Sequence, residues 1–193
     1  MIDADAVAIH LNPLQEAVQP EGETSFKGIL EKIGEVTRGL DKPVIVKETG
    51  AGIAAEEAKK LEAKGVKGID VSGVGGTSFA AVEYYRAKRQ KNSFQRKLGD
   101  IFWDWGIPTA VSVVEVSQTV NIPVIASGGV RNGLEMAKAL ALGASLTSLS
   151  QPTLQAAVKG VKETKNMLSL LIEELRSSMF LLGAESVKAL REV

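Results

Sequence analysis

The sequence lacks several residue types on which whole classes of protein depend. Its 193 residues include no cysteine and a single histidine, His10. The absence of cysteine excludes disulfides, thiolate metal sites and thiol catalysis. With one histidine, any bound metal ion must be held mainly by carboxylate oxygens, and Mg²⁺ is the cation that suits such ligands.

An excess of charge of one sign is also missing. The 23 basic and 23 acidic side chains cancel, whereas proteins that bind nucleic acid or anionic membranes usually carry excess Lys and Arg. No apolar run reaches the roughly 18 residues that a membrane-spanning helix needs, and the first residues lack the positive region of a signal peptide. We expect a cytoplasmic protein that binds neither nucleic acid nor membrane, with any anion site confined to a local pocket.

Short β-branched runs alternate with longer amphipathic stretches, a pattern typical of βα units and a parallel sheet. Five strands are predicted, at 7–11, 43–46, 68–71, 123–126 and 145–149. Helices are predicted between them at 26–38, 54–63, 79–88, 111–120 and 134–142, and after them at 153–158, 162–182 and 185–191. The long connection 90–106 should contain a helix of its own. We expect a single domain over 1–193, with βα units to residue 150 and a helical tail over 151–193.

Five parallel strands leave two architectures open. One is a doubly wound open sheet, and the other is part of a (β/α)₈ barrel, which needs at least about 200 residues when complete. Periodicity does not choose between them, but in both the active site lies at the carboxyl ends of the strands.

Polar residues gather at two of these strand ends. After the first strand, His10 and Asn12 fall on the same side, and a proline turn then presents Gln15 and Glu16, whose carboxylate could hold Mg²⁺. Lys47 directly follows a buried strand, where a partly desolvated ammonium suits an anionic cofactor. A solvated Gln–Glu pair, and a lysine that snorkels or pairs with Glu48, are the structural alternatives.

Glycine-rich loops follow the third and fourth strands, at 72–78 and 127–133. Such loops allow backbone N–H groups to approach a phosphate closely at the start of a helix. Neither loop matches the dinucleotide or P-loop spacing, so those two nucleotide-binding folds lose support. Two glycine loops in one small domain are hard to explain as turns alone, which favours a phosphate site.

In this order, the motifs closely resemble those of the type 2 isopentenyl-diphosphate isomerases. The segments that carry the resemblance are HLNPLQE, PVIVKE, IDVSG, GGTSFAAVE, WGIPTA and IPVIASGGVRNGLEMAKALALGA. The resemblance implies a (β/α)₈ TIM-barrel fold, seen here as an incomplete barrel of about strands four to eight followed by C-terminal helices. It also implies interconversion of isopentenyl and dimethylallyl diphosphate, with reduced FMN, Mg²⁺ and NADPH as reductant, in a homo-oligomer such as a tetramer or octamer.

The resemblance also assigns roles to individual positions. Gln15 would contact the hydrocarbon end of the substrate, and Glu16 would bind Mg²⁺. His10 and Asn12 would contact the diphosphate, and Lys47 would lie beside the flavin, so that Gln15 and Lys47 become the catalytic candidates. The remaining FMN contacts would come from Ser72, Thr77, Gly128, Gly129, Val130, Arg131, Ser150 and Gln151. At 148–151 the chain departs from the family, which usually has Gly-x-Ala there, although backbone donors could survive the change.

The family's N-terminal half, with its first three strands, has no counterpart in this sequence. Five strands of a barrel would leave two open edges, which favours pairing with another chain. A non-catalytic half-barrel subunit that needs a partner therefore stays open. So does an FMN-dependent oxidoreductase of the hydroxy-acid-oxidase or IMP-dehydrogenase type, which shares the lysine after a strand and the late glycine phosphate loop.

Overall fold

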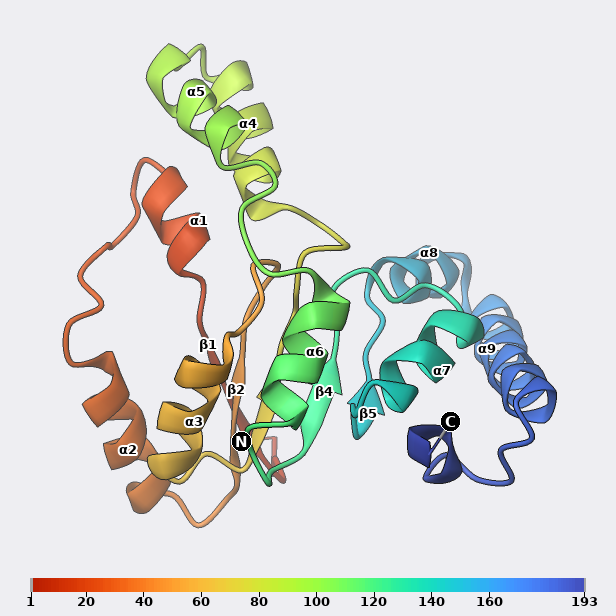
Figure 1. The fold of residues 1–193 in the computed structure, drawn as a ribbon. Helices are drawn as coiled ribbons and strands as arrows, with labels where there is room; N and C mark the ends of the chain where they lie inside the picture. Colours follow the sequence, from red (N-terminus) through yellow and green to blue (C-terminus); the bar gives the residue numbers. More distant parts are fainter. Residues whose placement is uncertain (1, 193) are drawn as a thin grey trace.

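The computed structural model describes residues 2–192, and within that range all strands join one five-stranded parallel sheet (Figure 1). Each strand falls within or one residue beyond its predicted range. The strands are β1 (Val7–His10), β2 (Val44–Lys47), β3 (Gly68–Asp70), β4 (Val124–Ala126) and β5 (Leu146–Thr147).

Between one and three helices separate successive strands up to β5, and further helices follow it. The helices are α1 (Pro13–Val18), α2 (Ile29–Gly39), α3 (Ala55–Ala63), α4 (Phe79–Arg89), α5 (Ser93–Ile101), α6 (Thr109–Ser117), α7 (Gly133–Ala141), α8 (Gln151–Lys159) and α9 (Val161–Leu181). A short 3₁₀ turn, η1 (Ala189–Glu192), comes last. Of the helices in 2–192, none has the length and apolar character to cross a lipid bilayer.

The strand order decides between the two architectures that the sequence leaves open. The strands pair in sequence order, β1-β2-β3-β4-β5, and every pair is parallel. A doubly wound sheet reverses its strand order at a switch point, whereas a barrel adds each strand beside the last one. The fold is therefore part of a TIM-type barrel, as the sequence motifs indicate.

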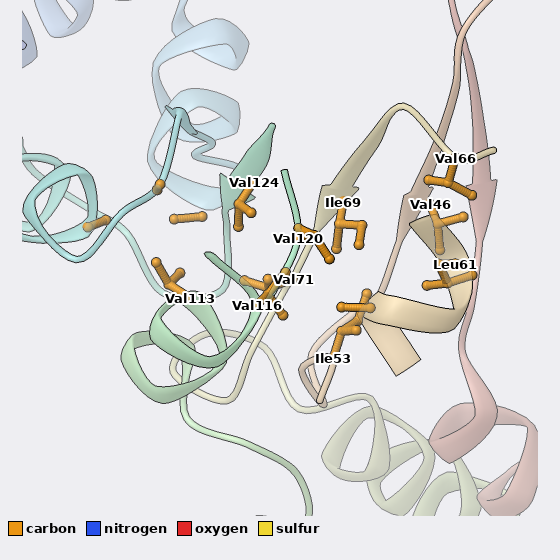
Figure 2. Close-up of a cluster of buried hydrophobic side chains, with 14 of the residues drawn as sticks. Val46, Ile53, Leu61, Val66, Ile69, Val71, Val113, Val116, Val120 and Val124 are labelled. Atoms are coloured by element: carbon orange, nitrogen blue, oxygen red, sulfur yellow. The ribbon is translucent and has the colours of Figure 1, made fainter. Parts of the chain in front are cut away.

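The two faces of the sheet differ in burial. One face packs against α3 and α6, where Val46, Ile69 and Val124 meet Leu61 and Val116 in the main hydrophobic core (Figure 2). On the opposite face, which a closed barrel would enclose, Ile45 and Ile125 are only half-buried and Leu146 is exposed. We refer to this side of the sheet as the open face, and at the carboxyl ends of the strands it borders the cavity described below.

Two segments differ in kind from the sequence-based expectation, and a third is confirmed. Residues predicted as a proline turn form the helix α1, because Pro13 occupies its first position, where a missing N–H costs nothing. The predicted helix at 185–191 is wrong, since only the 3₁₀ turn η1 forms there. The connection 90–106 does contain a helix, α5, which packs beside α4 away from the sheet (Figure 1).

Candidate functional site

A cavity of ≈ 730 Å³ opens at the carboxyl ends of the strands. Its volume lies within the range of small-molecule and cofactor sites. Most of the residues that the sequence singled out for a cofactor or substrate line this cavity: His10, Lys47, Ser72, Thr77, Gly128, Gly129, Val130, Arg131, Ser150 and Gln151. Asn12, Gln15 and Glu16 do not line it: Asn12 immediately precedes α1, and Gln15 and Glu16 lie within that helix.

A row of charged and polar side chains crosses the floor of the cavity. The register aligns His10 of β1 with Lys47 of β2, and Lys47 with Asp70 of β3. Residues aligned in neighbouring parallel strands share one face of the sheet, so all three side chains rise from the open face. Partial burial and the charge of Lys47 lower the pKa of His10, against the opposing attraction of Glu16. Burial raises the pKa of Asp70, although Ser127 and Lys47 offset part of the rise.

Lys47 is not paired with the carboxylate of Glu48, which was the structural alternative for its position. Its ammonium donates instead to the backbone carbonyl of Glu48, at 2.8 Å. The buried Glu48 carboxylate accepts the backbone N–H groups of Thr49, Gly50 and Ala51 at 2.5–2.6 Å. Burial raises the pKa of Glu48, and these amides act in the opposite direction. The charge of Lys47 therefore remains available to the cavity.

The two glycine-rich loops pack directly against each other. Gly128 and Gly129 have φ values of +95° and +90°, in the region that favours glycine. A Cβ atom on Gly128 would lie 2.2 Å from the carbonyl oxygen of Gly73, and one on Gly129 would lie 2.2 Å from that of Gly75. The glycines at these two positions are thus required by the contact between loops.

The loop over 127–131 directs its carbonyl groups towards the protein. The carbonyl of Ser127 accepts the Gly73 N–H at 3.2 Å, that of Gly128 accepts the Thr109 hydroxyl at 2.6 Å, and that of Gly129 accepts the Arg131 guanidinium at 2.6 Å. In a trans peptide the following N–H points the opposite way. Within 2–192, the N–H groups of Gly128, Gly129 and Val130 find no protein acceptor, so these three residues line the cavity with unused donors. Successive free amides of this kind bind anions.

The amino terminus of α8 opens onto the same cavity. Ser150 precedes the helix without capping it through its side chain, and Gln151 is the first helical residue. Helix amino termini carry unpaired N–H groups and a partial positive charge. The last loop therefore adds donors to those of the glycine loop, although its sequence departs from the expected small residues.

Asn12, Gln15 and Glu16 form a separate polar group at the start of α1. The Asn12 amide donates to Glu16 at 2.9 Å, and the Gln19 amide and the Glu23 N–H donate to the other oxygen of Glu16 at 2.9 and 2.8 Å. These donors lower the pKa of Glu16, the Glu23 N–H most of all. Within the described residues, no group of three or more His, Cys, Asp or Glu side chains could hold a metal ion.

Sequence reasoning missed two residues of the cavity floor, Asp70 and Ser127. Both line the cavity, and the Ser127 hydroxyl donates to the Asp70 carboxylate. A signal for Asp70 was available, because it is the one acidic residue inside a predicted strand and lies two residues before a glycine loop. For Ser127 no signal existed, since a serine before two glycines is common in loops.

Comparison with known proteins identifies the family. The sequence pattern of the FMN-dependent dehydrogenases matches residues 14–193, which is nearly the whole chain. The chain belongs to the FMN-dependent dehydrogenase family. A crystal structure of mandelate oxidase has the same fold with a TM-score of 0.59 at 30% identity, over 84% of this chain and 40% of that one.

Several archaeal proteins resemble this member of the FMN-dependent dehydrogenase family more strongly. Isopentenyl-diphosphate delta-isomerase of Pyrococcus furiosus is 55% identical over 193 residues, which is 100% of this chain and 48% of the relative. That of Methanothermobacter thermautotrophicus is 53% identical over 192 residues, covering 100% of this chain and 53% of the relative. The chain therefore spans about half the length of the curated relatives it matches.

Proposed function

We propose that this chain supplies the FMN-binding, carboxyl-terminal part of an isopentenyl-diphosphate delta-isomerase. The observation that carries the proposal is the loop over 127–131, whose free amides face a cavity floored by Lys47. Such a site suits a phosphate and an anionic ring together. The identity of 55% to the Pyrococcus furiosus isomerase over the whole chain supports the choice of reaction. The reaction would interconvert isopentenyl and dimethylallyl diphosphate in the cytoplasm.

The residues of the cavity fit FMN by their chemistry. The amides of Gly128, Gly129 and Val130, with the start of α8 at Ser150 and Gln151, would hold the phosphate. Ser72 and Thr77 would contact the flavin from the β3–α4 loop, and Arg131 would hold that loop in place through its bond to the Gly75 carbonyl. When bound in its reduced form, with NADPH as the source of electrons, FMN supplies an acid and base for proton transfer.

Lys47 would serve that chemistry by its charge. Its ammonium lies on the cavity floor and is not neutralised by Glu48, whose carboxylate is occupied by three backbone amides. A fixed positive charge in a partly dry site stabilises negative charge on a cofactor ring more strongly than it would in water. We assign Lys47 this role, and we assign Gln15 the contact with the hydrocarbon end of the substrate.

His10 and Asn12 would bind the substrate diphosphate, and Glu16 would bind Mg²⁺. A carboxylate offers about four acceptor positions, of which protein donors occupy three at Glu16. One position on Oε1 is left, and Mg²⁺ is commonly held by a single carboxylate together with water and substrate phosphates. Glu16 therefore fits a role in which Mg²⁺ neutralises the diphosphate.

The open sheet suggests how the site would be completed. The face that carries Ile45, Ile125 and Leu146 is incompletely buried, and both β1 and β5 are edge strands. Unpaired strand edges beside apolar surface favour pairing with more sheet. We infer that the chain acts within a homo-oligomer or pairs with the N-terminal half that its relatives contain. Residues 1–193 would then form a single domain, which is the FMN-binding portion of a TIM barrel.

A second function has a specific observation in its favour. Mandelate oxidase has the same fold at 30% identity, and an FMN-dependent oxidation of a hydroxy acid would use the same flavin site. The absence of histidine from the residues that follow β1 argues against it, because hydroxy-acid oxidases carry their histidine base late in the chain.

An isomerisation assay separates these functions. The protein is supplied with isopentenyl diphosphate, FMN, Mg²⁺ and NADPH without oxygen, alone and together with an N-terminal half, and dimethylallyl diphosphate is measured. We expect isomerisation, a loss of at least about 100-fold in Glu16→Gln, and little change in the control Glu21→Gln on the same segment. Oxidation of 2-hydroxy acids without isomerisation would favour the oxidoreductase, and the absence of both activities would favour the non-catalytic subunit.

A further inference from the structure

Asp70 is a half-buried carboxylate in the cavity to which the proposed function gives no role. It lies between Lys47 on one side and β4 on the other, on the open face of the sheet. Its register partner in β4 is Ile125, and Ser127 follows two residues later. Because side chains alternate along an extended chain, Ser127 points to the same side as Ile125, and its hydroxyl reaches the carboxylate of Asp70.

Ser127 forms hydrogen bonds to β3 and to the loop after β3, one through its side chain and one through its backbone. The hydroxyl donates to Asp70, and the backbone carbonyl accepts the N–H of Gly73 at 3.2 Å. The residue is 9% exposed, so water does not compete freely for either bond. Ser127 is therefore a fixed point from which the glycine loop departs.

The loop needs such a fixed point because two flexible residues, Gly128 and Gly129, follow Ser127. Gly128 and Gly129 both have positive φ values, and glycine loses more conformational freedom on folding than any other residue. The direction of the Gly128 N–H is set by the peptide plane that it shares with the carbonyl of Ser127. If Ser127 moves, the first of the three free amides no longer faces the cavity.

We propose that Asp70 is a positioning residue, which holds Ser127 through its hydroxyl and thereby orients the backbone amides of 128–130 towards a bound phosphate group. Asp70 itself does not contact the phosphate, since a carboxylate repels an anion and lies on the floor beside Lys47. The proposal rests on the proposed function for the identity of the ligand, because the phosphate in question is that of FMN.

The test uses four variants of the full chain: Asp70→Ala, Asp70→Asn, Ser127→Ala and the double variant Asp70→Ala/Ser127→Ala. Asparagine keeps an oxygen that accepts the Ser127 hydroxyl, whereas alanine does not. FMN affinity is measured by quenching of flavin fluorescence, with and without an N-terminal half. Hydrogen exchange of the Gly73 amide, which donates to the Ser127 carbonyl, is measured without any ligand.

We expect Asp70→Ala and Ser127→Ala each to weaken FMN binding by about tenfold. The double variant should lose no more FMN affinity than the weaker-binding single variant, because the two single substitutions remove the same hydrogen bond. Asp70→Asn should stay within about threefold of the unaltered protein. In the two alanine variants the Gly73 amide should exchange faster, while the Lys67 amide, which donates to Val44 at the far end of the sheet, should not change.

Three results would overturn the proposal. The first is a loss of FMN affinity in the double variant that equals the product of the two single losses. The second is an Asp70→Asn variant that binds FMN as weakly as Asp70→Ala. The third is an equal increase in the hydrogen-exchange rates of the Lys67 and Gly73 amides, which would indicate a general loss of stability. Failure of the proposed function is distinguishable: the unaltered protein would then not bind FMN, while the exchange of Gly73 would still report whether Asp70 holds Ser127.

Discussion

His10 is the only histidine, so its ionisation can be followed by NMR without ambiguity. Partial burial and the nearby charge of Lys47 place its pKa below the ordinary value of 6.5. Lys47→Met should raise the pKa of His10 by removing a repelling charge, and Glu16→Gln should lower it by removing an attracting one. A His10 pKa that does not respond to Lys47→Met would contradict the row of side chains described for the cavity floor.

The sign of the pH effect on stability follows from the same shift. Because the pKa of His10 is lower in the folded protein, the unfolded chain binds more protons between the two pKa values. The free energy of unfolding should therefore rise with pH across that window. In a His10→Gln variant this part of the pH dependence should disappear in denaturant titrations measured at several pH values.

Gly128 offers a direct test of the contact between the two glycine loops. Gly128→Ala would place a Cβ atom 2.2 Å from the Gly73 carbonyl oxygen at a φ of +95°, so we expect a loss of about 2–4 kcal/mol in the free energy of unfolding. Gly39→Ala is the matched control, because a Cβ atom there meets nothing within 4 Å. Chemical denaturation should show Gly39→Ala within about 1 kcal/mol of the unaltered protein. Equal effects of the two substitutions would exclude the close loop contact.

At the scale of the element, the β2–α3 loop depends on one buried side chain. Glu48→Ala would leave the N–H groups of Thr49, Gly50 and Ala51 without their acceptor, and we expect a loss of about 2–4 kcal/mol in the free energy of unfolding. Glu48→Gln keeps one acceptor oxygen and should lose less. Glu57→Ala, an exposed carboxylate on the neighbouring helix, is the control and should change stability by at most about 1 kcal/mol. A Glu48→Ala variant as stable as this control would show that the loop is held by other contacts.

The elements themselves were largely predictable from the sequence. Strands and helices with clear periodicity, such as β2 and α3, form within one or two residues of their predicted bounds. The helix α1 was missed because its six residues are too few for a periodic signal. The barrel architecture could be recognised only from the strand order, which depends on how the strands pair and cannot be read from the periodicity of the sequence.

The candidate site was predictable where chemistry is local in sequence. Glycine loops and a lysine after a buried strand could be recognised as single segments, and the fold brings them to one cavity. The bond between Asp70 and Ser127 joins residues 57 positions apart, and only the register of β3 and β4 brings them together. Contacts of this kind depend on tertiary structure, so the sequence could point to the glycine loops and to Lys47 but not to the hydrogen bond that joins β3 to the loop after β4.

For the molecule as a whole, the open sheet predicts association. Leu146 lies on the edge strand β5 and is 58% exposed. Leu146→Lys should abolish self-association, or complex formation with an N-terminal half, in sedimentation velocity, because a charge on an edge strand blocks pairing. The control Asp41→Lys, in the exposed turn before β2, should associate normally. A highly stable monomer that also binds no N-terminal half would contradict the role of the open face.

The central claim is that the cavity binds a flavin by its phosphate, and a comparison of FMN with riboflavin tests it most directly. The two ligands differ only by that phosphate. Fluorescence titrations would be performed with the chain alone and with an N-terminal half. The arrangement of free amides at 128–130 and the start of α8 predicts that FMN binds at least about 100-fold more tightly than riboflavin. Equal affinities, or no binding of either flavin in both preparations, would contradict the account.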